Sequence, residues 1–389
     1  MNLRIIDDIS DLSNKYVLLR DDFNVQIENG KIVDTFRIEQ SMPTINKLRA
    51  AGARVVICAH LGRPKNGYDS KLSLQPVADY LKVPFVDDCL KRDFLANMKN
   101  GDVVLLENLR FYKGEEENDD DFTKRLACGF DVFVNDAFAV SHRVAASIVG
   151  ITKLLPSYAG ILLQTEIENI TSFMEKPKRP LLAIVGGAKV STKIGVLKSL
   201  CKVADTMIVG GALGTTFNYA LGLPVGHSLY ELEQKQNALD ILDFAKQNNC
   251  RMLLPIDKGV GQSFDKNAVR ENRNVSEIKD TDVIIDAGIN TTKRNVQEIE
   301  NAKTVIWNGT FGMAEWGEKW GYGSFEIAKK IAEQTKKGLL DSLIGGGETV
   351  AALDACGVRD DMTYVSTGGG AFLEFIEGKD LPGISVLKK

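Results

Sequence analysis

One theme recurs along the first half of the chain and constrains its fold more than any other feature. A short β-branched run ends in polar residues and is followed by a helical pattern. The runs are Lys15–Arg20, Ala53–His60, Asp102–Arg110 and Asp131–Phe138, and the helical pattern Arg37–Gly52 closes on glycine. Strands that alternate with helices predict a parallel, doubly wound sheet, whose ligands bind beyond the carboxyl ends of the strands.

The second half repeats a strand followed by glycine. In Leu181–Ile194 an apolar run leads to a glycine pair and then to Lys189 and Lys193, spaced four apart. On a helix this spacing would place both ammonium groups on one face near the helix start, where a cation opposes the dipole unless an anion is bound. Six further segments repeat the theme: Thr206–Gly214, Arg251–Gly259, Asp282–Gly288, Thr304–Gly312, Ser342–Thr349 and Thr363–Ala371.

Two of the glycine-rich turns, Gly345–Gly347 and Gly368–Gly370, precede helical patterns. Glycine lets the backbone approach a ligand closely, and N–H groups at a helix start can hold phosphate oxygens. Several such turns on one sheet edge favour a nucleotide. Other motifs for nucleotide or hydrolase chemistry are missing from the sequence: G-x-x-x-x-G-K-[ST], G-x-G-x-x-G after a strand, the protein-kinase set and G-x-S-x-G.

Polar side chains, several of them cationic, follow the strands of the first half. They are Asp22, Asn24, His60, Arg63, Arg110, His142 and Arg143, and Arg37 opens the helix after the first loop. Any one of these arginines alone is typical of a solvated loop. As a set behind parallel strands they should converge on one sheet edge, and arginine binds carboxylate or phosphate with paired hydrogen bonds. The first half therefore predicts a small, multiply anionic substrate.

Composition limits the other functions. The net charge of −4 argues against nucleic acid or a membrane surface as a general partner, so an anion site must be a local concentration of cations. The N-terminus carries acids within its apolar stretch, unlike a signal peptide, and no apolar run approaches the ~18 residues of a membrane helix. The six cysteines are scattered without a C-x-x-C pair, which favours a reducing cytoplasm. The acidic run Glu115–Asp121 predicts a solvated loop and helix start.

A boundary between two domains is expected near the middle of the chain, because 389 residues are enough for two cores. Leu162–Glu175 has helical periodicity, and Lys176–Pro180 ends it, since proline cannot continue a helix. We place the boundary on this helix.

Eight motifs, in order along nearly the whole chain, resemble those of the phosphoglycerate kinase family: RDDFNV (Arg20–Val25), HLGRP (His60–Pro64), ENLRF (Glu107–Phe111), SHR (Ser141–Arg143), GGAKVSTKI (Gly186–Ile194), WNGTFGMAE (Trp307–Glu315), GGGETVAA (Gly345–Ala352) and STGGGAFLEFIEGKDLPG (Ser366–Gly383). The resemblance implies an α/β fold of two doubly wound parallel-sheet (Rossmann-like) lobes joined by a helix hinge. Residues 1–170 would form an N-terminal phosphoglycerate-binding domain, with the C-terminal tail 372–389 packed back on it. Residues 171–371 would form the nucleotide-binding domain.

The same resemblance implies reversible phosphoryl transfer between 1,3-bisphosphoglycerate and ADP, giving 3-phosphoglycerate and ATP in glycolysis, by a cytoplasmic monomer that uses Mg²⁺. The phosphoglycerate would be held by Asp22, Phe23, Asn24, Arg37, His60, Leu61, Gly62, Arg63, Arg110 and Arg143. ATP or ADP would be held by Gly187, Lys193, Gly210, Gly211, Gly312, Glu315, Gly345, Gly346, Gly347, Glu348 and Thr349, with Glu348 also at the metal. The catalytic set would be Arg37, Lys189, Lys193, Gly346 and Gly369.

The implied chemistry agrees with the basic and glycine-rich segments. The acceptor carboxylate is already ionised at neutral pH, so alignment and compensation of charge matter more than a general base. Bringing the two substrates together implies domain closure about Leu162–Pro180 and neighbouring segments. The chain departs from the usual family motifs at a few positions: Asp21 for valine and Gln26 for proline in RVDFNVP, Ala145 for the second histidine of HRAH, Thr310 in GPxG, DAGINT for DIGPKT, and Glu348 for aspartate in GGGDT.

Three other readings of the residues stay open at this point. A non-catalytic two-lobed binding protein could close on an anion, but it would not need a lysine pair at a helix start. A sugar or acid kinase of another family would need a carboxylate base beside a hydroxyl, and it would leave the basic residues unexplained. The departures also permit an enzyme copy that has become regulatory, which the intact basic set disfavours.

Overall fold

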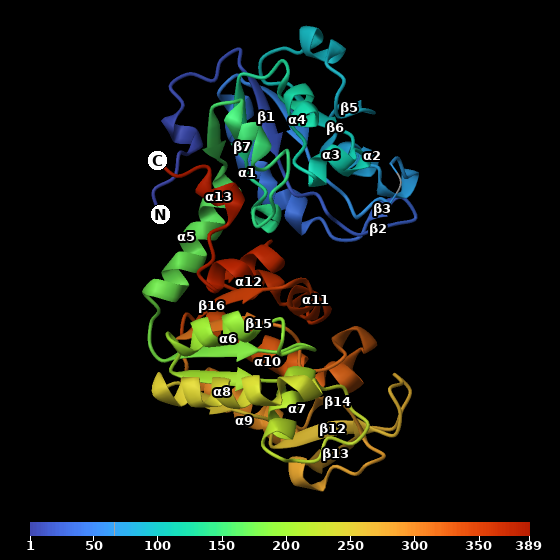
Figure 1. The fold of residues 1–389 in the computed structure, drawn as a ribbon, viewed down its shortest axis with the longest axis vertical. Helices are drawn as coiled ribbons and strands as arrows, with labels where there is room; N and C mark the ends of the chain where they lie inside the picture. The colour runs from blue at the N-terminus through green and yellow to red at the C-terminus, as the bar shows by residue number, and fades with distance from the viewer. Residues whose placement is uncertain (66) are drawn as a thin grey trace. The chain divides into compact units, whose positions relative to one another are not determined.

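The computed structural model describes residues 1–65 and 67–389. The chain forms two compact units, Met1–Glu168 with Asp380–Lys389, and Asn169–Lys379. The division falls inside helix α5 (Ile161–Glu175), so the backbone passes from the first unit to the second within one continuous helix (Figure 1). Among the described residues, no helix has the length and apolarity needed to cross a membrane.

The first unit is built on a six-stranded sheet of order β5-β6-β4-β1-β7-β8, and every pairing in it is parallel. This confirms the predicted parallel sheet, since four of its strands lie in the predicted runs. The strands are β1 (Tyr16–Arg20), β4 (Arg54–Cys58), β5 (Phe85–Val86), β6 (Val103–Leu106), β7 (Val132–Asn135) and β8 (Ser157–Ala159).

Apolar cores cover both faces of this sheet. Val17 and Leu19 of β1 join one core with α1, whereas Leu18 between them joins the other core with α4. Successive strand side chains point to opposite faces, so a run that is apolar throughout is buried on both sides. The helices are α1 (Phe36–Ala50), α2 (Gln75–Leu81), α3 (Lys113–Glu116), α4 (Asp120–Ala127) and α13 (Pro382–Ser385), and β2 (Ile27–Glu28) pairs with β3 (Lys31–Ile32).

The second unit has its own six-stranded parallel sheet, of order β11-β10-β9-β15-β16-β17. Its strands are β9 (Leu181–Val185), β10 (Thr206–Val209), β11 (Arg251–Leu253), β15 (Thr304–Asn308), β16 (Asp341–Gly345) and β17 (Tyr364–Val365). The helices of this unit are α6 (Ile194–Cys201), α7 (Gly211–Ala220), α8 (Lys235–Gln247), α9 (Ile289–Asn301), α10 (Glu318–Lys336), α11 (Gly347–Ala355) and α12 (Gly370–Ile376).

One strand-then-glycine segment, Asp282–Gly288, does not extend the parallel sheet, and Arg251–Gly259 extends it only with its first residues, so the expectation was wrong for the rest. The segment Arg251–Gly259 splits at Pro255 into β11 and β12 (Asp257–Gly261), because proline lacks the N–H that a continuous ladder needs. β12 pairs antiparallel with β13 (Glu271–Asn274) and with β14 (Val283–Ala287), which holds the segment Asp282–Gly288. These three strands form a separate small sheet.

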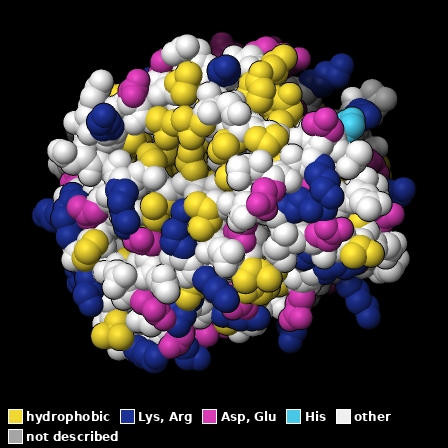
Figure 2. Space-filling view, turned by 90° about the horizontal axis from the view of Figure 1, so that it is seen from below, with side chains coloured by type: hydrophobic (Ala, Val, Ile, Leu, Met, Phe, Trp, Pro, Cys, Tyr) yellow, Lys and Arg dark blue, Asp and Glu magenta, His cyan; other side chains and the backbone are white. Residues whose placement is uncertain are grey.

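Charge is mixed on the face seen in Figure 2, where lysine and arginine side chains alternate with acidic ones and with apolar clusters. Cations are therefore not gathered into one continuous field on that face. An anion site on this face would therefore have to be built from a few side chains that the fold brings together.

Candidate active site

In the first unit, predicted substrate residues meet where β1 and β4 end. Asp22, just past β1, is buried and forms an ion pair with Arg37 in the first turn of α1. His60, just past β4, is also buried, and its Nδ1 lies 3.6 Å from the Asp22 carboxylate. Burial alone would raise the pKa of Asp22, but the charge of Arg37 brings it below its ordinary value. Asp22 is therefore a charged anchor for Arg37.

A second set of contacts joins the loops after β1, β4 and β6. Asn24 Oδ1 accepts a hydrogen bond from Gly62 N at 2.8 Å, and Gly62 O accepts one from Arg110 Nη1 at 2.7 Å. Gly62 has φ +63°, and a Cβ there would lie 2.6 Å from the Leu72 side chain. A larger residue at Gly62 would thus disturb a backbone that bonds to two predicted substrate residues.

The remaining substrate residues of the prediction are less connected. Phe23 and Leu61 have buried side chains in the core, so only their backbone is left for a ligand. Arg63 is exposed, and it makes no ion pair or hydrogen bond with any residue that the structure describes. Arg143 is half-buried and belongs to a cavity beside Arg110.

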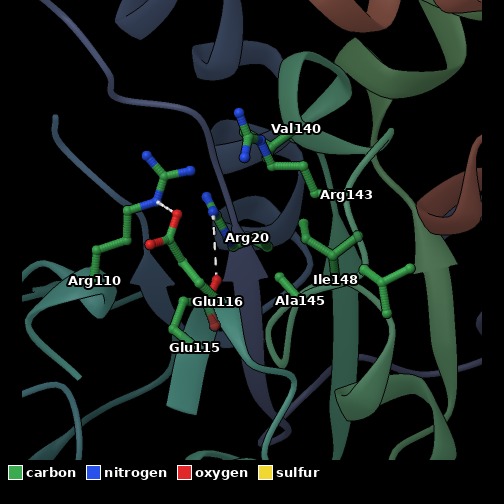
Figure 3. Close-up of a pocket in the computed structure, with 9 residues that line it drawn as sticks. Arg20, Arg110, Glu115, Glu116, Val140, Arg143, Ala145 and Ile148 are labelled. Atoms are coloured by element: carbon green, nitrogen blue, oxygen red, sulfur yellow. Dashed lines mark ion pairs between the residues drawn. The ribbon is translucent and has the colours of Figure 1, made fainter. Parts of the chain in front are cut away.

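This cavity has a volume of about 230 Å³ (Figure 3). Its lining is Arg20, Arg110, Glu115, Glu116, Val140, Arg143, Val144, Ala145 and Ile148. Three arginines and two glutamates in one lining make the cavity strongly polar on one side and aliphatic on the other. The Nε of Arg110 lies 3.3 Å from Glu116, and Arg20 Nη2 lies 3.9 Å from Glu115.

Glu115 does not lie in a solvated loop, as the sequence analysis expected. Its side chain is only 3 % exposed. The buried carboxylate is satisfied by hydrogen bonds that Ser147 N and Ser147 Oγ donate to it at 3.0 and 2.6 Å. Arg20, its other partner, was also not selected from the sequence. The available signal was an arginine at the end of an otherwise apolar strand, since a buried guanidinium requires a buried acceptor.

In the second unit, Lys193 joins the ends of neighbouring strands. Its Nζ donates to Gly186 O at 2.6 Å, past β9, and to Asn308 Oδ1 at 2.7 Å, at the end of β15. Asn308 Nδ2 donates in turn to Gly345 O at 2.7 Å, at the end of β16. Burial lowers the pKa of Lys193 to about 8, and the charge of Glu348 opposes that shift. Asn308 lies in one of the family motifs, but the sequence analysis did not predict it as a site residue. Its position as a polar residue at the end of a strand could have indicated such a role.

The expectation that Lys189 and Lys193 share a helix face was wrong. Helix α6 begins only at Ile194, and Lys193 stands at its N-cap. The preceding loop is held by Val190, which is fully buried, and by a 2.9 Å hydrogen bond from Ser191 N to Glu231. Lys189 is exposed, and its side chain makes no hydrogen bond or ion pair within the described residues.

Close crossings of the backbone explain several predicted glycines. Gly211 has φ +67°, and a Cβ there would lie 2.7 Å from Gly187 O; Gly346 has φ +98°, and its Cβ would lie 2.6 Å from Asn308 Nδ2. A Cβ would also collide at Gly210 with Phe311, at Gly312 with Trp320 O and at Gly345 with Phe372. Loops built in this way bring main-chain N–H groups together without side chains in front of them.

Other predicted nucleotide residues face open space. A Cβ at Gly347 or Gly369 would meet nothing within 4 Å among the described residues, so sterics do not demand glycine there. Glu348, in the first turn of α11, and Glu315, in the short turn Ala314–Trp316, are exposed. Thr349 is buried, and its Oγ1 accepts a 2.7 Å hydrogen bond from Gly309 N.

The acidic residues fit a metal that is bound together with phosphates. Among the described residues, no group of three or more histidine, cysteine, aspartate or glutamate side chains could hold an ion by itself. Mg²⁺ commonly takes one or two carboxylates and completes its shell with phosphates and water. A single exposed carboxylate such as Glu348, beside a glycine-rich helix start, fits that pattern.

Two parallel α/β units, one with a basic cluster at its strand ends and one with glycine loops around a half-buried lysine, define the class of a phosphotransferase. The model of a family described as phosphoglycerate kinase matches residues 6–379. This chain belongs to the phosphoglycerate kinase family, which confirms the resemblance seen in its motifs. It is accordingly a glycolytic kinase that transfers a phosphoryl group between 1,3-bisphosphoglycerate and ADP, with Mg²⁺.

Individual relatives agree with this assignment. The chain is 44% identical over 396 residues to phosphoglycerate kinase of Methylorubrum extorquens, covering 100% of this chain and 99% of the relative. It is 45% identical over 395 residues to the enzyme of Mesorhizobium japonicum, with 99% of each covered. The solved structure of phosphoglycerate kinase from Coxiella burnetii gives a TM-score of 0.86 at 39% identity, covering 99% of this chain and 98% of that one.

Proposed function

We propose that the first unit binds the phosphoglycerate and the second unit the nucleotide. The observation that carries this division of roles is Lys193, a largely desolvated cation hydrogen-bonded to residues beyond β9 and β15. A cation without an acidic hydrogen-bond partner at the strand ends of a parallel sheet is suited to a phosphate oxygen.

The phosphoglycerate side draws on the basic set of the first unit. Arg37, Arg110 and Arg143 supply planar donors for carboxylate and phosphate oxygens, and Asp22 orients Arg37 through its ion pair. Asn24 and Gly62 fix the loops, and His60 adds a hydrogen-bonding ring. Arg63, exposed and without a described partner, is available for the substrate.

The nucleotide side follows from the family resemblance, residue by residue. Gly210 and Gly211 would lie by the adenine, Glu315 would take the ribose hydroxyls, and Gly345–Thr349 would face the phosphates, with Glu348 at Mg²⁺. Gly187 and Gly312 would also contact the nucleotide. The metal would supply charge compensation at the phosphate oxygens. Lys189, Lys193, Gly346 and Gly369 would meet the phosphoryl group in flight.

The chemistry needs alignment and charge rather than a proton acceptor. The attacking carboxylate of 3-phosphoglycerate is ionised at neutral pH, and the charge on the transferred group is compensated by Arg37, Lys189 and Lys193. Substrates held on separate units require a closure, for which α5 offers the continuous connection. We further propose a cytoplasmic monomer, in keeping with a glycolytic role and with six unpaired cysteines.

A coupled assay tests these roles, with ATP, Mg²⁺ and 3-phosphoglycerate and an excess of a dehydrogenase that consumes the acyl phosphate. We expect Lys193→Ala to lower kcat by about 10²–10³-fold, since it removes a preorganised charge, and to leave the KM for phosphoglycerate nearly unchanged. Lys202→Ala, an exposed lysine at the other end of α6, is the matched control and should retain activity. A raised KM for phosphoglycerate with normal kcat would contradict the role of Lys193.

A further inference from the structure

Arg20 is a buried cation outside the predicted substrate set. Its side chain is 2 % exposed, and its Nε donates to Ser147 Oγ at 2.8 Å. Ser147 Oγ donates onward to Glu115 at 2.6 Å, and the Glu115 carboxylate lies 3.9 Å from Arg20 Nη2. Arg20, Ser147 and Glu115 thus form a buried network whose members fix one another's orientation. Figure 3 shows the ion pair between Arg20 and Glu115.

Arg20 connects this network to His60. Arg20 Nη2 lies 3.3 Å from His60 Nδ1. A guanidinium has only N–H donors, so a hydrogen bond between these atoms requires a lone pair on Nδ1 and places the ring proton on Nε2. The Asp22 carboxylate is the competing neighbour, but at 3.6 Å it is beyond hydrogen-bond distance of Nδ1. Its oxygens accept instead from Asn24 N and from Arg37.

Burial, together with three nearby arginines, disfavours a second proton on the ring. Burial is the main cause that lowers the pKa of His60 well below its ordinary value, and Arg20, Arg110 and Arg37 lower it further. Asp22 alone raises it. Arg20 ends β1, Arg110 lies in the turn Leu109–Phe111, and Arg37 lies in α1. Asp22 lies in the loop after β1. The ring is therefore neutral at neutral pH.

We propose that Glu115 and Ser147 are positioning residues that, through Arg20, hold His60 as the neutral tautomer with its proton on Nε2. The ring then presents a single N–H donor to the phosphoglycerate, whose anionic oxygens are acceptors. This inference rests on the proposed role of His60 in binding phosphoglycerate. The inference gives Glu115 and Ser147 a role although neither is proposed to contact the substrate. It also predicts that the contribution of His60 to phosphoglycerate binding does not change with pH around the ordinary histidine pKa of about 6.5.

The tautomer can be measured directly, because the chain has three histidines. Enzyme labelled with ¹⁵N-histidine gives ring-nitrogen NMR signals, and His60→Gln identifies those of His60. We expect Nε2 of His60 to be protonated and Nδ1 to be unprotonated. This state should persist from about pH 8 down to about pH 5.5, one unit below the ordinary histidine pKa. An imidazolium, or a proton on Nδ1, in the unmodified enzyme would overturn the proposal whatever the variants do.

Glu115→Gln then tests the positioning network, with Glu117→Gln as the matched control on an exposed glutamate of the same run. We expect Glu115→Gln to mix the two neutral tautomers and to raise the KM for phosphoglycerate about tenfold, with the KM for ATP unchanged. If circular dichroism shows that this variant is unfolded, Ser147→Ala replaces it with the same expectation.

The outcomes separate this inference from the proposed function. Unchanged tautomer and KM in a folded Glu115→Gln or Ser147→Ala would remove the positioning role and leave the kinase intact. An unchanged KM for phosphoglycerate in His60→Gln would instead show that His60 does not bind the substrate, and the proposed function of the ring would fail with the inference.

Discussion

Asp21 is a carboxylic acid at a position where the family usually has valine, and its surroundings are those of a core residue. It is fully buried, and neither carboxylate oxygen has a geometrically acceptable hydrogen bond among the residues the structure describes. Burial, and next the charge of Asp136, raise the pKa of Asp21 well above its ordinary value. Asp136 is itself raised to about 6, so this buried pair favours holding a proton.

The sign of the resulting pH dependence follows from linkage. The unfolded chain binds this proton with a pKa of about 3.9, more weakly than the folded protein does. The contribution of Asp21 to the free energy of unfolding is therefore greatest at acid pH, falls as pH rises from about 4 through the raised folded-state pKa, and then levels off.

We accordingly expect Asp21→Val to raise the free energy of unfolding by about 1–3 kcal/mol at about pH 8, since it removes a buried carboxylate whose desolvation the nearby Arg20 charge offsets only in part. The gain should shrink toward about pH 5. Urea unfolding across this range measures it, with Asp280→Asn, an exposed acid, as the control. Lower stability of Asp21→Val at the alkaline end would show that the ionised carboxylate stabilises the folded protein, which would contradict the prediction.

At the scale of elements, the two ends of helix α7 require glycine for different reasons, although the sequence alone does not distinguish them. Gly211 at its start and Gly222 just past its end have φ +67° and +82°. A Cβ would lie 2.7 Å from Gly187 O at the first position but within 4 Å of nothing described at the second. The two glycines thus share a left-handed backbone and differ in whether another backbone crosses against them.

Alanine at these positions should separate conformational strain from loop contact. Either variant places an L-residue in the left-handed region, which costs about 1–2 kcal/mol of stability. We expect Gly222→Ala to show that loss alone. Gly211→Ala should also push the Gly187 loop and raise the KM for ATP, while the KM for phosphoglycerate stays constant. Thermal unfolding and steady-state kinetics measure both, and equal kinetics in the two variants would count against a nucleotide role for this loop.

At the scale of the whole molecule, the last residues of the chain belong to the first unit. Leu381, Ile384 and Leu387 are buried, and Gly383 N donates to Ser141 O at 2.8 Å. Leu3 forms an antiparallel bridge with Lys388, so both termini meet on this unit (Figure 1). The second unit is consequently a single continuous segment, whereas the first is closed by residues from both ends.

Deleting Asp380–Lys389 should weaken the first unit selectively. The deletion removes three buried apolar side chains, and the loss of that burial costs about 1.5–3 kcal/mol for each. Hydrogen exchange read by mass spectrometry should show faster exchange in β1 and β7 and unchanged protection in β9 and β15. Alanine at both Lys388 and Lys389, whose surface ion pairs contribute little, is the control. Equal loss of protection in both units would mean that they unfold as one.

Much of the candidate site could be located from the sequence because its polar residues lie at strand ends. Alternating apolar runs indicate parallel strands, and parallel strands place Asp22 and His60 on one edge whatever the details of packing. The same rule anticipated the segments after β9 and β16. It could not show where α6 begins, since Lys189 and Lys193 have helical spacing and only the burial of Val190 and the bond from Ser191 to Glu231 keep their loop out of the helix.

The sequence by itself determined the alternation of strands and helices and the family, and it supplied most of the residues proposed to bind substrate, because these depend on neighbours along the chain. Only the tertiary structure decided that β12 and β14 leave the parallel sheet, and that Glu115 is a buried partner of Arg20. A run of acidic residues is ordinarily exposed to solvent. Glu115 is buried instead because Arg20, at the end of β1, supplies a cation and Ser147 supplies two hydrogen-bond donors. Such partners meet only through the fold, so no local pattern records them.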